Sequence, residues 1–569
     1  MKPLRMFAWL LAAACAVYAA SNLLFVYRYW WPEPFSDQRH WIDALYRGGA
    51  WSAFTLAVNE HRPLTHSALF LFDWYAFSGS QVVLECLVLL THLGAFALLF
   101  EPIRRSSLPR PVVLTMAGLT MVCATWLLQC ENLCWPLELS FTLANLGNVS
   151  ACWFASRLWA GPSILTWTSA FRSALAPVVC AAAGTFAFGH GLAAWPALAM
   201  FSLAARQFRL AAVMALGGAA VVSGYAAAGV HSTPSTDLAS IVNFALVFLG
   251  RPFAPAWSFD GMLGRLSDGI AFSTYPWIWV ASISGLVVLC FFLASHLLRR
   301  PPAFERGFYL SVAVIAVGAA LLTAIGRAYA GAGLAFASRY VSAQLLFWLP
   351  LAALGVLHWF GQERPLWTQA AWCAAIAALV AGTVPANREM GSYCREHTAN
   401  LAQQNLAVRL GIFDEFGWRF MVWDPPSWMP QLARLRREGK TTFSGRDVAP
   451  VAKALPQDFR EMPCQGEINK TRIVETPEGP ARVVTGWAWD PSQRIEASRI
   501  VLVRPGDRVI VGAGYPGAFY FMSTGAQSEP AMWNTGFTAH ARPTHHPEPF
   551  QTWAHFGGNR YCRIGTMQP

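Results

Sequence analysis

Two carboxylates lie close together in the segment that follows the first apolar run of the chain. Asp37 and Asp43 both fall within "SDQRHWIDAL", which we expect to form a short amphipathic helix. An ionised carboxylate at a membrane surface could act as a general base that deprotonates an acceptor hydroxyl group. An exposed aspartate is more often simply solvated, and the sequence leaves open which of the two would be the base.

A run of hydrogen-bonding residues opens the stretch "VNEHRPLTHSALF", where Asn59, Glu60, His61 and Arg62 are adjacent. Adjacent residues on a helix point in different directions, so these side chains cannot form one helical face. Pro63 favours an extended residue before it and the start of a new helix after it. A helix cap needs only one short acceptor. We therefore interpret Glu60, His61 and Arg62 as one wall of a binding cavity.

Two further short connections between apolar runs carry polar residues. The segment "QCENLCWPLE" holds Glu131 and Asn132, and Glu131 could bring a second carboxylate to a site shared with Asp37. The segment "FGHG" places His190 between glycines that favour a tight turn. A lone histidine is more often structural than catalytic, so His190 is the less specific of these candidates.

The glycine-rich segment "GRAYAGAGLAFASRY" carries Arg327 and Arg339 near its two ends, with Tyr340 next to Arg339. Arginines close to a membrane are costly and are usually paired. Two guanidinium groups beside exposed backbone amides could bind a phosphate or pyrophosphate group through bidentate hydrogen bonds. The alternative is that the arginines extend to the membrane surface, which suits Arg327 better than Arg339.

The composition indicates what kind of protein positions these residues. The chain has 569 residues, of which 55% are hydrophobic and 13% charged, and its mean hydropathy is +0.36. Soluble domains carry about 25% charged residues. The net charge of +11 comes from Lys and Arg scattered over short loops, so we expect no nucleic acid as a partner. No P-loop, G-x-S-x-G or H-E-x-x-H motif occurs in the sequence.

The apolar runs predict an all-α polytopic membrane protein, because only helices satisfy their backbone polar groups within such runs. About eleven crossings are expected, at 6–27, 81–100, 111–129, 138–156, 173–189, 191–205, 210–229, 275–297, 307–326, 341–360 and 366–386. Basic residues occupy alternate connections, which places the amino terminus in the cytoplasm and the chain after residue 387 outside. The candidate residues then all fall on the outer face. The run "LASIVNFALVFLG" is too short to span, and we expect it to re-enter the membrane or lie along its surface.

The tail differs in character from the rest of the chain. We expect a transmembrane domain over 1–386, a periplasmic helical linker region over 387–459, beginning with an amphipathic helix, and a periplasmic β-sandwich over 460–569. The two runs "RIVLV" and "RVIVGAG", joined through Arg504–Asp507, predict a β-hairpin. Cys464 and Cys562 lie near the two ends of this module. A disulfide between them is permitted outside the cell membrane and would stabilise the module by roughly 4–5 kcal/mol.

The blocks "NEHRP", "QCENLCW", "FGHGLAAWP" and "GR…SRY", taken as an ordered set, resemble a group of bacterial polytopic proteins within the GT-C superfamily of membrane glycosyltransferases. The resemblance covers about residues 1–386. It implies a polyprenyl-phosphate-linked sugar as donor, an acceptor on the periplasmic side of the bacterial inner membrane, and an acidic residue of the first outer loop, Asp37, as base or metal ligand. Some members carry a pair of adjacent acidic residues, which is missing here. The resemblance therefore leaves open whether a divalent metal is bound.

These observations together lead us to expect an inverting glycosyl transfer to a cell-envelope glycan or lipid, such as a lipopolysaccharide. Asp37 would be catalytic, Arg327 and Arg339 would hold the donor phosphate, and residues 238–250 would receive the polyprenyl chain. The remaining substrate-binding candidates are Asp43, Glu60, His61, Arg62, Glu131, Asn132, His190 and Tyr340. The alternatives are a translocator of lipid-linked glycans or another transporter, and a non-catalytic envelope assembly partner.

Overall fold

The computed structural model describes residues 2–34, 36–58, 61–161, 166–227, 235–254, 276–298, 304–361, 364–413, 425–444, 453–476, 479–518, 535–541 and 549–567. The chain forms two compact units. The first, called here the helical unit, comprises Met1–Arg28, Ala44–Leu71 and Val82–Met390. The second, the tail unit, comprises Tyr29–Asp43, Phe72–Gln81 and Gly391–Pro569. The tail unit thus includes two segments, Tyr29–Asp43 and Phe72–Gln81, that precede most of the helical unit in the sequence.

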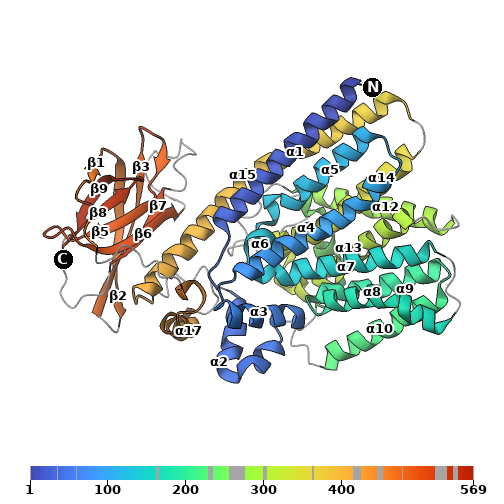
Figure 1. Ribbon diagram of the computed structural model, residues 1–569, viewed down its shortest axis with the longest axis horizontal. Helices are drawn as coiled ribbons and strands as arrows, with labels where there is room; N and C mark the ends of the chain where they lie inside the picture. The colour runs from blue at the N-terminus through green and yellow to red at the C-terminus, as the bar shows by residue number, and fades with distance from the viewer. Residues whose placement is uncertain are drawn as a thin grey trace. The chain divides into compact units, whose positions relative to one another are not determined.

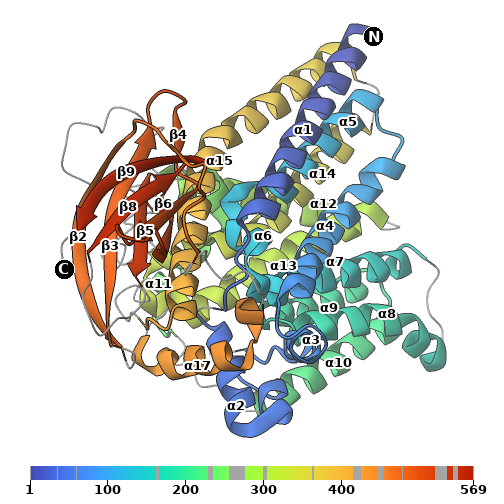
Figure 2. The same ribbon diagram turned by 60° about the vertical axis from the view of Figure 1, so that its left-hand side comes forward.

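Long helices build most of the chain before residue 410 (Figures 1 and 2). They are α1 (Lys2–Tyr29), α2 (Gln38–Phe54), α3 (Leu64–Ala76), α4 (Val82–Arg105), α5 (Arg110–Thr125), α7 (Leu139–Trp159), α8 (Trp167–Thr185), α9 (Ala194–Ala204), α10 (Phe208–Ala227), α11 (Leu238–Gly250), α12 (Pro276–Leu298), α13 (Phe304–Arg327), α14 (Val341–Phe360) and α15 (Leu366–Arg409). Short turns connect some of them, including α6 (Cys130–Cys134), η3 (Gly189–Ala193), η4 (Arg251–Phe253) and η8 (Ser338–Tyr340).

Eight of the described helices are long and apolar enough to cross a membrane, so the chain is a multi-pass membrane protein. They cover Pro3–Tyr29, Val82–Arg105, Arg110–Cys134, Phe208–Tyr225, Pro276–Leu297, Phe304–Ala330, Ser338–Phe360 and Leu366–Arg409. The predicted count of about eleven is higher because it includes α7, α8 and α9. Helix α9 has 11 residues and so extends about 16 Å, roughly half of the hydrocarbon thickness. Helix α7 carries several buried polar residues.

Glycines bring α7 close to its neighbours and so fix the position of its polar side chains. A Cβ atom at Gly147 would lie 2.7 Å from the carbonyl oxygen of Cys180 on α8. One at Gly191 in η3 would lie 2.6 Å from the backbone nitrogen of Thr185. Small residues allow this close approach of backbones between membrane helices. The packing therefore holds both α7 and η3 against α8.

Helix α11 begins at a well-defined cap. The side chain of Asp237 accepts hydrogen bonds from the backbone nitrogens of Ala239 and Ser240, each at 3.2 Å, which satisfies two amides of the first turn. The helix has 13 residues, so it extends about 20 Å and is too short to span the hydrocarbon core. This length agrees with the expectation that the segment re-enters the membrane or lies along its surface.

Helix α15 continues across the predicted domain boundary at residues 386 and 387. It runs for 44 residues with Pro385 inside it, and so joins the last predicted crossing to the predicted amphipathic helix. Proline removes one helical hydrogen bond, and membrane helices tolerate that loss when neighbouring groups supply partners. Here Asn387 and Asn22 of α1 exchange side-chain hydrogen bonds of 2.9 and 3.3 Å, and α1 lies alongside α15 (Figure 1).

The carboxy-terminal strands form one curled sheet rather than the two sheets of the predicted sandwich (Figure 2). The strands are β1 (Arg460–Glu461), β2 (Gln465–Thr476), β3 (Gly479–Asp490), β4 (Ile495–Glu496), β5 (Arg499–Val503), β6 (Ile510–Ala518), β7 (Gly536–Ala541), β8 (Phe550–His555) and β9 (Arg560–Met567). Their order is β1-β9-β8-β5-β6-β7-β3-β2, with β4 paired to β3. A Cβ atom at Gly565 would lie 2.9 Å from Ile468, so β9 approaches β2 across the sheet and gives a half-barrel.

The inside of the half-barrel holds the core of the tail unit. Side chains from several strands pack there, among them Val484, Ile500, Leu502, Phe537, Phe550 and Ala554. Cys464 and Cys562 form a disulfide next to this core, as the sequence analysis expects. The predicted hairpin at Arg504–Asp507 joins β5 to β6 in an antiparallel pair. Cross-sheet packing inside one curled sheet therefore replaces the face-to-face packing of a sandwich.

Candidate functional site

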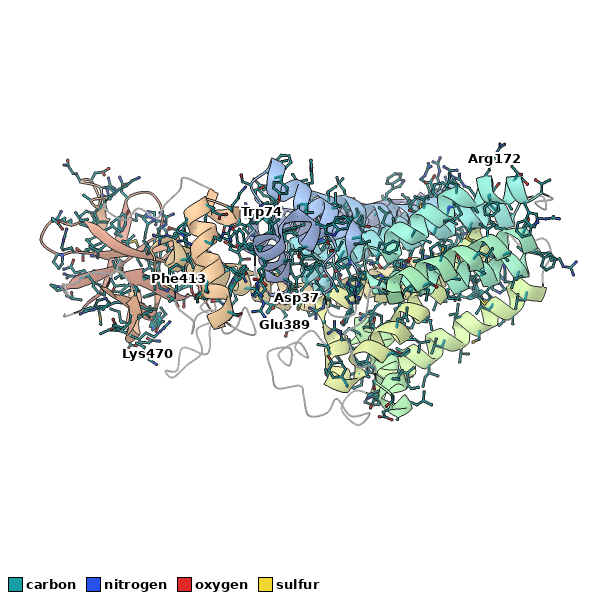
Figure 3. All side chains as sticks on the ribbon, turned by 90° about the horizontal axis from the view of Figure 1, so that it is seen from below. Asp37, Trp74, Arg172, Glu389, Phe413 and Lys470 are labelled. Carbon is teal, nitrogen blue, oxygen red and sulfur yellow. A yellow bond between two sulfur atoms is a disulfide. The ribbon has the colours of Figure 1, made fainter. Side chains whose placement is uncertain are left out.

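Asp37 lies at the start of α2 in the tail unit (Figure 3). It follows Ser36, whose φ of 50° turns the chain. Its side chain is 40% exposed, and its Oδ1 lies 4.0 Å from Nε2 of His40. Burial lowers the pKa of His40 and outweighs the effect of the Asp37 carboxylate, which raises it. The imidazole is therefore mainly neutral at pH 7. An exposed carboxylate beside a neutral imidazole is free to accept a proton from a substrate.

Asp43 and Glu33 differ from Asp37 in having firm hydrogen-bond partners. Asp43 accepts a hydrogen bond of 2.8 Å from Nε2 of Gln431, which lies on α17 (Pro425–Glu438). Glu33 is buried, accepts a hydrogen bond of 3.2 Å from Nδ2 of Asn405, and burial raises its pKa to about 7. These contacts favour Asp37 over Asp43 as the residue available for proton transfer.

The segment before Asp37 is held by the tail end of α15. Oγ1 of Thr398 donates a hydrogen bond of 2.8 Å to the carbonyl oxygen of Tyr29. The ring of Trp31 lies 4.3 Å from that of His397, measured between centroids. Together with the Glu33 contact, these interactions explain why residues 29–43 belong to the tail unit.

Asp73, which stands within an apolar run, has a structural role. Its Oδ2 accepts a hydrogen bond of 3.0 Å from the backbone nitrogen of Gln81. Oε1 of Gln81 accepts one of 2.6 Å from Nε2 of Gln38, and Nε2 of Gln81 donates one of 3.1 Å to the carbonyl oxygen of Pro32. Asp73 therefore connects residues 72–81 to the segment around Asp37.

In the helical unit, Glu131 holds the glycine-rich segment in place. Its Oε1 lies 3.1 Å from Nη1 of Arg339, which is an ion pair. Its Oε2 accepts hydrogen bonds from the backbone nitrogen of Arg339 at 2.9 Å and from Oγ of Ser338 at 2.7 Å. The structure therefore brings the predicted residues Glu131 and Arg339 together, and Glu131 offsets the charge of that guanidinium.

Asn132 and His190 are linked through a chain of buried hydrogen bonds. Nδ2 of Asn132 donates to the carbonyl oxygen of Arg339 at 2.7 Å and to Oγ of Ser342 at 3.0 Å. The same Oγ accepts from Nδ2 of Asn145 at 2.9 Å. Oδ1 of Asn145 lies 3.2 Å from Nε2 of His190. Four separate elements, α6, α7, η3 and α14, thus meet in one polar network.

An aromatic cluster lies beside this network. The ring of His61 lies 3.8 Å from that of Phe188, and Phe141 lies 4.5 Å from Phe188, measured between centroids. Phe141 also lies 4.6 Å from His190 and 5.8 Å from Tyr340. Three of the predicted residues, His61, His190 and Tyr340, are therefore gathered around two phenylalanines.

The remaining predicted site residues are Arg62, Arg327 and Glu60. The backbone nitrogen of Arg62 donates a hydrogen bond of 3.0 Å to the hydroxyl of Tyr225, and its side chain is half-buried. Arg327 is half-buried at the end of α13. Glu60 lies outside the described residues.

A small cavity adjoins the network inside the helical unit. Asn145, Asn148 and His190 line it together with apolar residues of α7, α13 and α14. Among the described residues, Oδ1 of Asn148 and Nδ1 of His190 have no hydrogen-bond partner. About 10 Å³ is open to the centre of a water molecule, which is close to the space that one buried water needs. The cavity therefore suits a bridging water and is far too small for a sugar.

Sequence reasoning missed three buried polar residues near the glycine-rich segment, namely Arg251, Ser342 and Gln344. Ser342 and Gln344 lie inside an apolar run and carry no signal of their own. Arg251 could have been noticed, because it ends the short apolar run of α11. Within the described residues, no group of three or more His, Cys, Asp or Glu side chains could hold a metal ion.

The assignment of function rests on the residues and the geometry given above. No protein-family model, no curated protein and no solved structure matches this chain.

Proposed function

We propose that the chain is a membrane glycosyltransferase. It moves a sugar from a polyprenyl-phosphate donor to a cell-envelope glycan or lipid at the periplasmic face of the bacterial inner membrane. The observation that supports this proposal most strongly is the Asp37 carboxylate, which is 40% exposed and has only a 4.0 Å approach to His40 as an ionic contact in the described part of the chain. A general base must reach solvent and substrate in this way.

In the proposed reaction, Asp37 takes the proton of the acceptor hydroxyl as its oxygen attacks the anomeric carbon of the sugar. A new carbon–oxygen bond forms on one side while the bond to the donor phosphate breaks on the other, so the configuration inverts. Polyprenyl phosphate leaves with the bonding electron pair. Positive groups that stabilise its charge in the transition state accelerate the step.

Arg327 and Arg339 are the cations that the glycine-rich segment offers for this phosphate. Arg339 already has Glu131 as an ion-pair partner at 3.1 Å, so its net contribution to binding an anion is reduced. Its contacts instead hold residues 338–340 against α6, which keeps the segment ordered. Arg327 lies half-buried at the end of α13.

The topology belongs to the same proposal. The amino terminus lies in the cytoplasm and the tail in the periplasm, which requires an odd number of crossings. The proposal counts eleven, with α7, α8 and α9 crossing in addition to the eight apolar helices. The disulfide between Cys464 and Cys562 supports this orientation, because disulfides persist in the periplasm and are rare in the cytoplasm.

Substitution of the two aspartates tests the proposed base. We expect Asp37→Asn to lower glycosyl transfer by about 10²–10⁴-fold, the usual contribution of a general base. Asp43→Asn is the matched control and should keep most of the activity, since the Asp43 carboxylate already accepts a hydrogen bond from Gln431. The measurement is glycan profiling of cells carrying each variant at equal membrane abundance, together with release of polyprenyl phosphate by the purified chain.

Full activity in the Asp37→Asn variant would remove Asp37 from the mechanism. Movement of lipid-linked glycan across the membrane without release of polyprenyl phosphate would instead identify a translocator. Glycan binding by a chain that neither transfers sugar nor moves lipid would identify an assembly partner.

A further inference from the structure

Arg251 is a fully buried cation at the carboxyl end of α11. Its relative exposure is 0%, and it opens the short turn η4 after Gly250. A guanidinium stays protonated in proteins, so a full positive charge lies inside the helical unit. Buried charges are costly unless an opposite charge and hydrogen bonds compensate them.

The contacts of Arg251 compensate this charge only weakly. Nε donates to the carbonyl oxygen of Phe336, and Nη1 donates to that of Ala254, both at 3.4 Å. This distance is at the outer limit for a hydrogen bond. The guanidinium carbon lies 5.0 Å from the centroid of the Phe336 ring.

No carboxylate forms an ion pair with Arg251 in the described part of the chain, and its Nη2 has no hydrogen-bond partner there. The charge of Glu389 acts on it from a distance, and Glu389 itself is exposed (Figure 3). Arg339 provides the contrast within the same unit, because its guanidinium has Glu131 at 3.1 Å.

A second buried side chain near Arg251 also has an open hydrogen-bonding position. Nε2 of Gln344 on α14 donates a hydrogen bond of 3.3 Å to the carbonyl oxygen of Ala335, which precedes the Phe336 carbonyl that Arg251 contacts. Oε1 of Gln344 has no partner among the described residues. Two buried polar side chains therefore hold consecutive carbonyls of the glycine-rich segment and leave polar atoms unsatisfied.

We propose that Arg251 binds the phosphate group of an amphiphilic phosphate ester. A guanidinium matches a phosphate through two parallel hydrogen bonds, and its open Nη2 together with the long contact of Nη1 leaves one such pair available. As an assignment to the donor phosphate, this inference rests on the proposed function. It gives the principal phosphate-binding role to Arg251 rather than to Arg327 or Arg339.

The surroundings of Arg251 suit a lipid tail attached to that phosphate. Helix α11 consists almost entirely of apolar residues, and Leu238, Val242 and Phe253 are exposed by 71%, 45% and 43%. Leu238 and Val242 lie in the first two turns of α11, and Phe253 lies in η4 two residues after Arg251. A phosphate on an apolar chain is recognised by this combination, whereas a free phosphate gains nothing from it.

Binding of farnesyl phosphate to the full chain in detergent or nanodiscs tests the inference. The wild type should bind farnesyl phosphate at least 10-fold more tightly than farnesol and at least 10-fold more tightly than inorganic phosphate. Arg251→Met should lower the farnesyl phosphate affinity to that of farnesol. Arg364→Met is the matched control, because Nε of Arg364 donates to a carbonyl at 3.1 Å and its guanidinium lies 4.9 Å from the Trp359 ring, yet Arg364 is exposed.

Thermal unfolding of the same variants separates a ligand-binding role from a structural one. A buried charge without a partner is usually replaced by an apolar side chain of similar size at no loss of stability. Arg251→Met should therefore keep or raise the Tm while losing the ligand. A large fall in Tm, with Arg251→Met retaining wild-type affinity per folded molecule, would mean that Arg251 only holds the two carbonyls, and the inference would be overturned.

Several other outcomes also decide the question. Equal affinity of the wild type and Arg251→Met for farnesyl phosphate overturns the inference. Equal affinity of the wild type for farnesyl and inorganic phosphate overturns the lipid part of it. If Arg251-dependent binding is found but no sugar is transferred, the proposed function fails and this site stands. If sugar transfer is found and Arg251→Met transfers normally, the proposed function stands and this site fails.

Discussion

At the scale of single residues, the burial of charge separates structural side chains from candidate functional ones. The Glu131 carboxylate is met by one guanidinium and by two further hydrogen bonds. Asp37 remains solvent-exposed with a distant histidine, and Arg251 is buried without a carboxylate in the described part of the chain. A charged side chain that the protein itself does not pair is one whose charge a substrate can meet.

Glu33 gives a prediction about pH. Its pKa of about 7 in the folded chain is above its ordinary value of 4.5, because burial disfavours the ionised form. The folded state therefore binds more protons between these two values, and the free energy of unfolding falls as pH rises from about 4.5 to about 7. For this buried group the fall amounts to about 3 kcal/mol. The Glu33→Gln variant should lack this fall and should have a higher Tm than the wild type above pH 7.

The measurement is the Tm of the purified full chain from pH 4 to pH 9. Glu461→Gln is the control, since the Glu461 side chain is 54% exposed and its ionic contact with Arg563 is 3.9 Å long. The prediction is wrong if the wild type and Glu33→Gln show parallel pH profiles.

At the scale of elements, the main feature is the junction at which α6, α7, η3 and α14 share hydrogen bonds. Ser342 is central to it, because its hydroxyl oxygen accepts from both Asn132 and Asn145. The second element-level feature is the attachment of the segment before α2 to α15 through Thr398, His397 and Asn405. The elements that carry the candidate residues are thus fixed by polar contacts as well as by apolar packing.

Ser342→Ala should destabilise the helical unit. The substitution removes the shared acceptor and leaves the Asn145 amide, which is 97% buried, without it. A loss of about 1–2 kcal/mol in the free energy of unfolding follows from such an unsatisfied group inside a membrane protein. Ser156→Ala is the matched control, because Oγ of Ser156 is also buried but donates only to the carbonyl of Trp153 in its own helix.

Unfolding of the two variants in parallel, in the same detergent, measures this difference. Equal stability of Ser342→Ala and Ser156→Ala would show that the junction is not held by the shared hydroxyl.

At the scale of the whole molecule, the two units differ in the state of their cysteines. The sequence contains 12 cysteines, of which Cys464 and Cys562 form a disulfide. The other ten are free, and nine of them belong to the helical unit while Cys394 belongs to the tail unit. One structural disulfide in the tail agrees with a tail outside the cytoplasm.

Thiol counting tests this arrangement. Denatured chain isolated from membranes under non-reducing conditions should react with ten equivalents of a maleimide, and with twelve after reduction. The double variant Cys464→Ala/Cys562→Ala should lower the stability of the sheet by about 2–5 kcal/mol, seen as a lower Tm in the full chain. Twelve reactive thiols before reduction would contradict both the disulfide and the periplasmic tail.

Local patterns in the sequence determined the helices, the strands and the position of the disulfide. Apolar runs of about 20 residues predict membrane helices because the bilayer leaves backbone polar groups no other partner, and α4, α13 and α14 agree with their predicted ranges. The pairing of Cys464 with Cys562 could be predicted because the two bracket one module. Of the roughly eleven predicted crossings, eight correspond to described helices that are long and apolar enough to span, because apolar character alone does not separate the short α9 from a membrane span.

Only the tertiary structure decided which side chains meet. Asn132 and Ser342 are 210 positions apart, and Gln431 and Asp43 are 388 apart. No periodicity along the chain encodes such contacts, which depend on how helices pack. The curling of the sheet into one half-barrel depends likewise on packing between distant strands. The sequence alone determined that the chain enters the membrane and carries polar residues between its helices. Folding decided that Glu131 neutralises Arg339, that Asp37 stays exposed, and that Arg251 is buried with no carboxylate paired to it among the described residues. Burial and pairing of this kind arise only when distant segments come together.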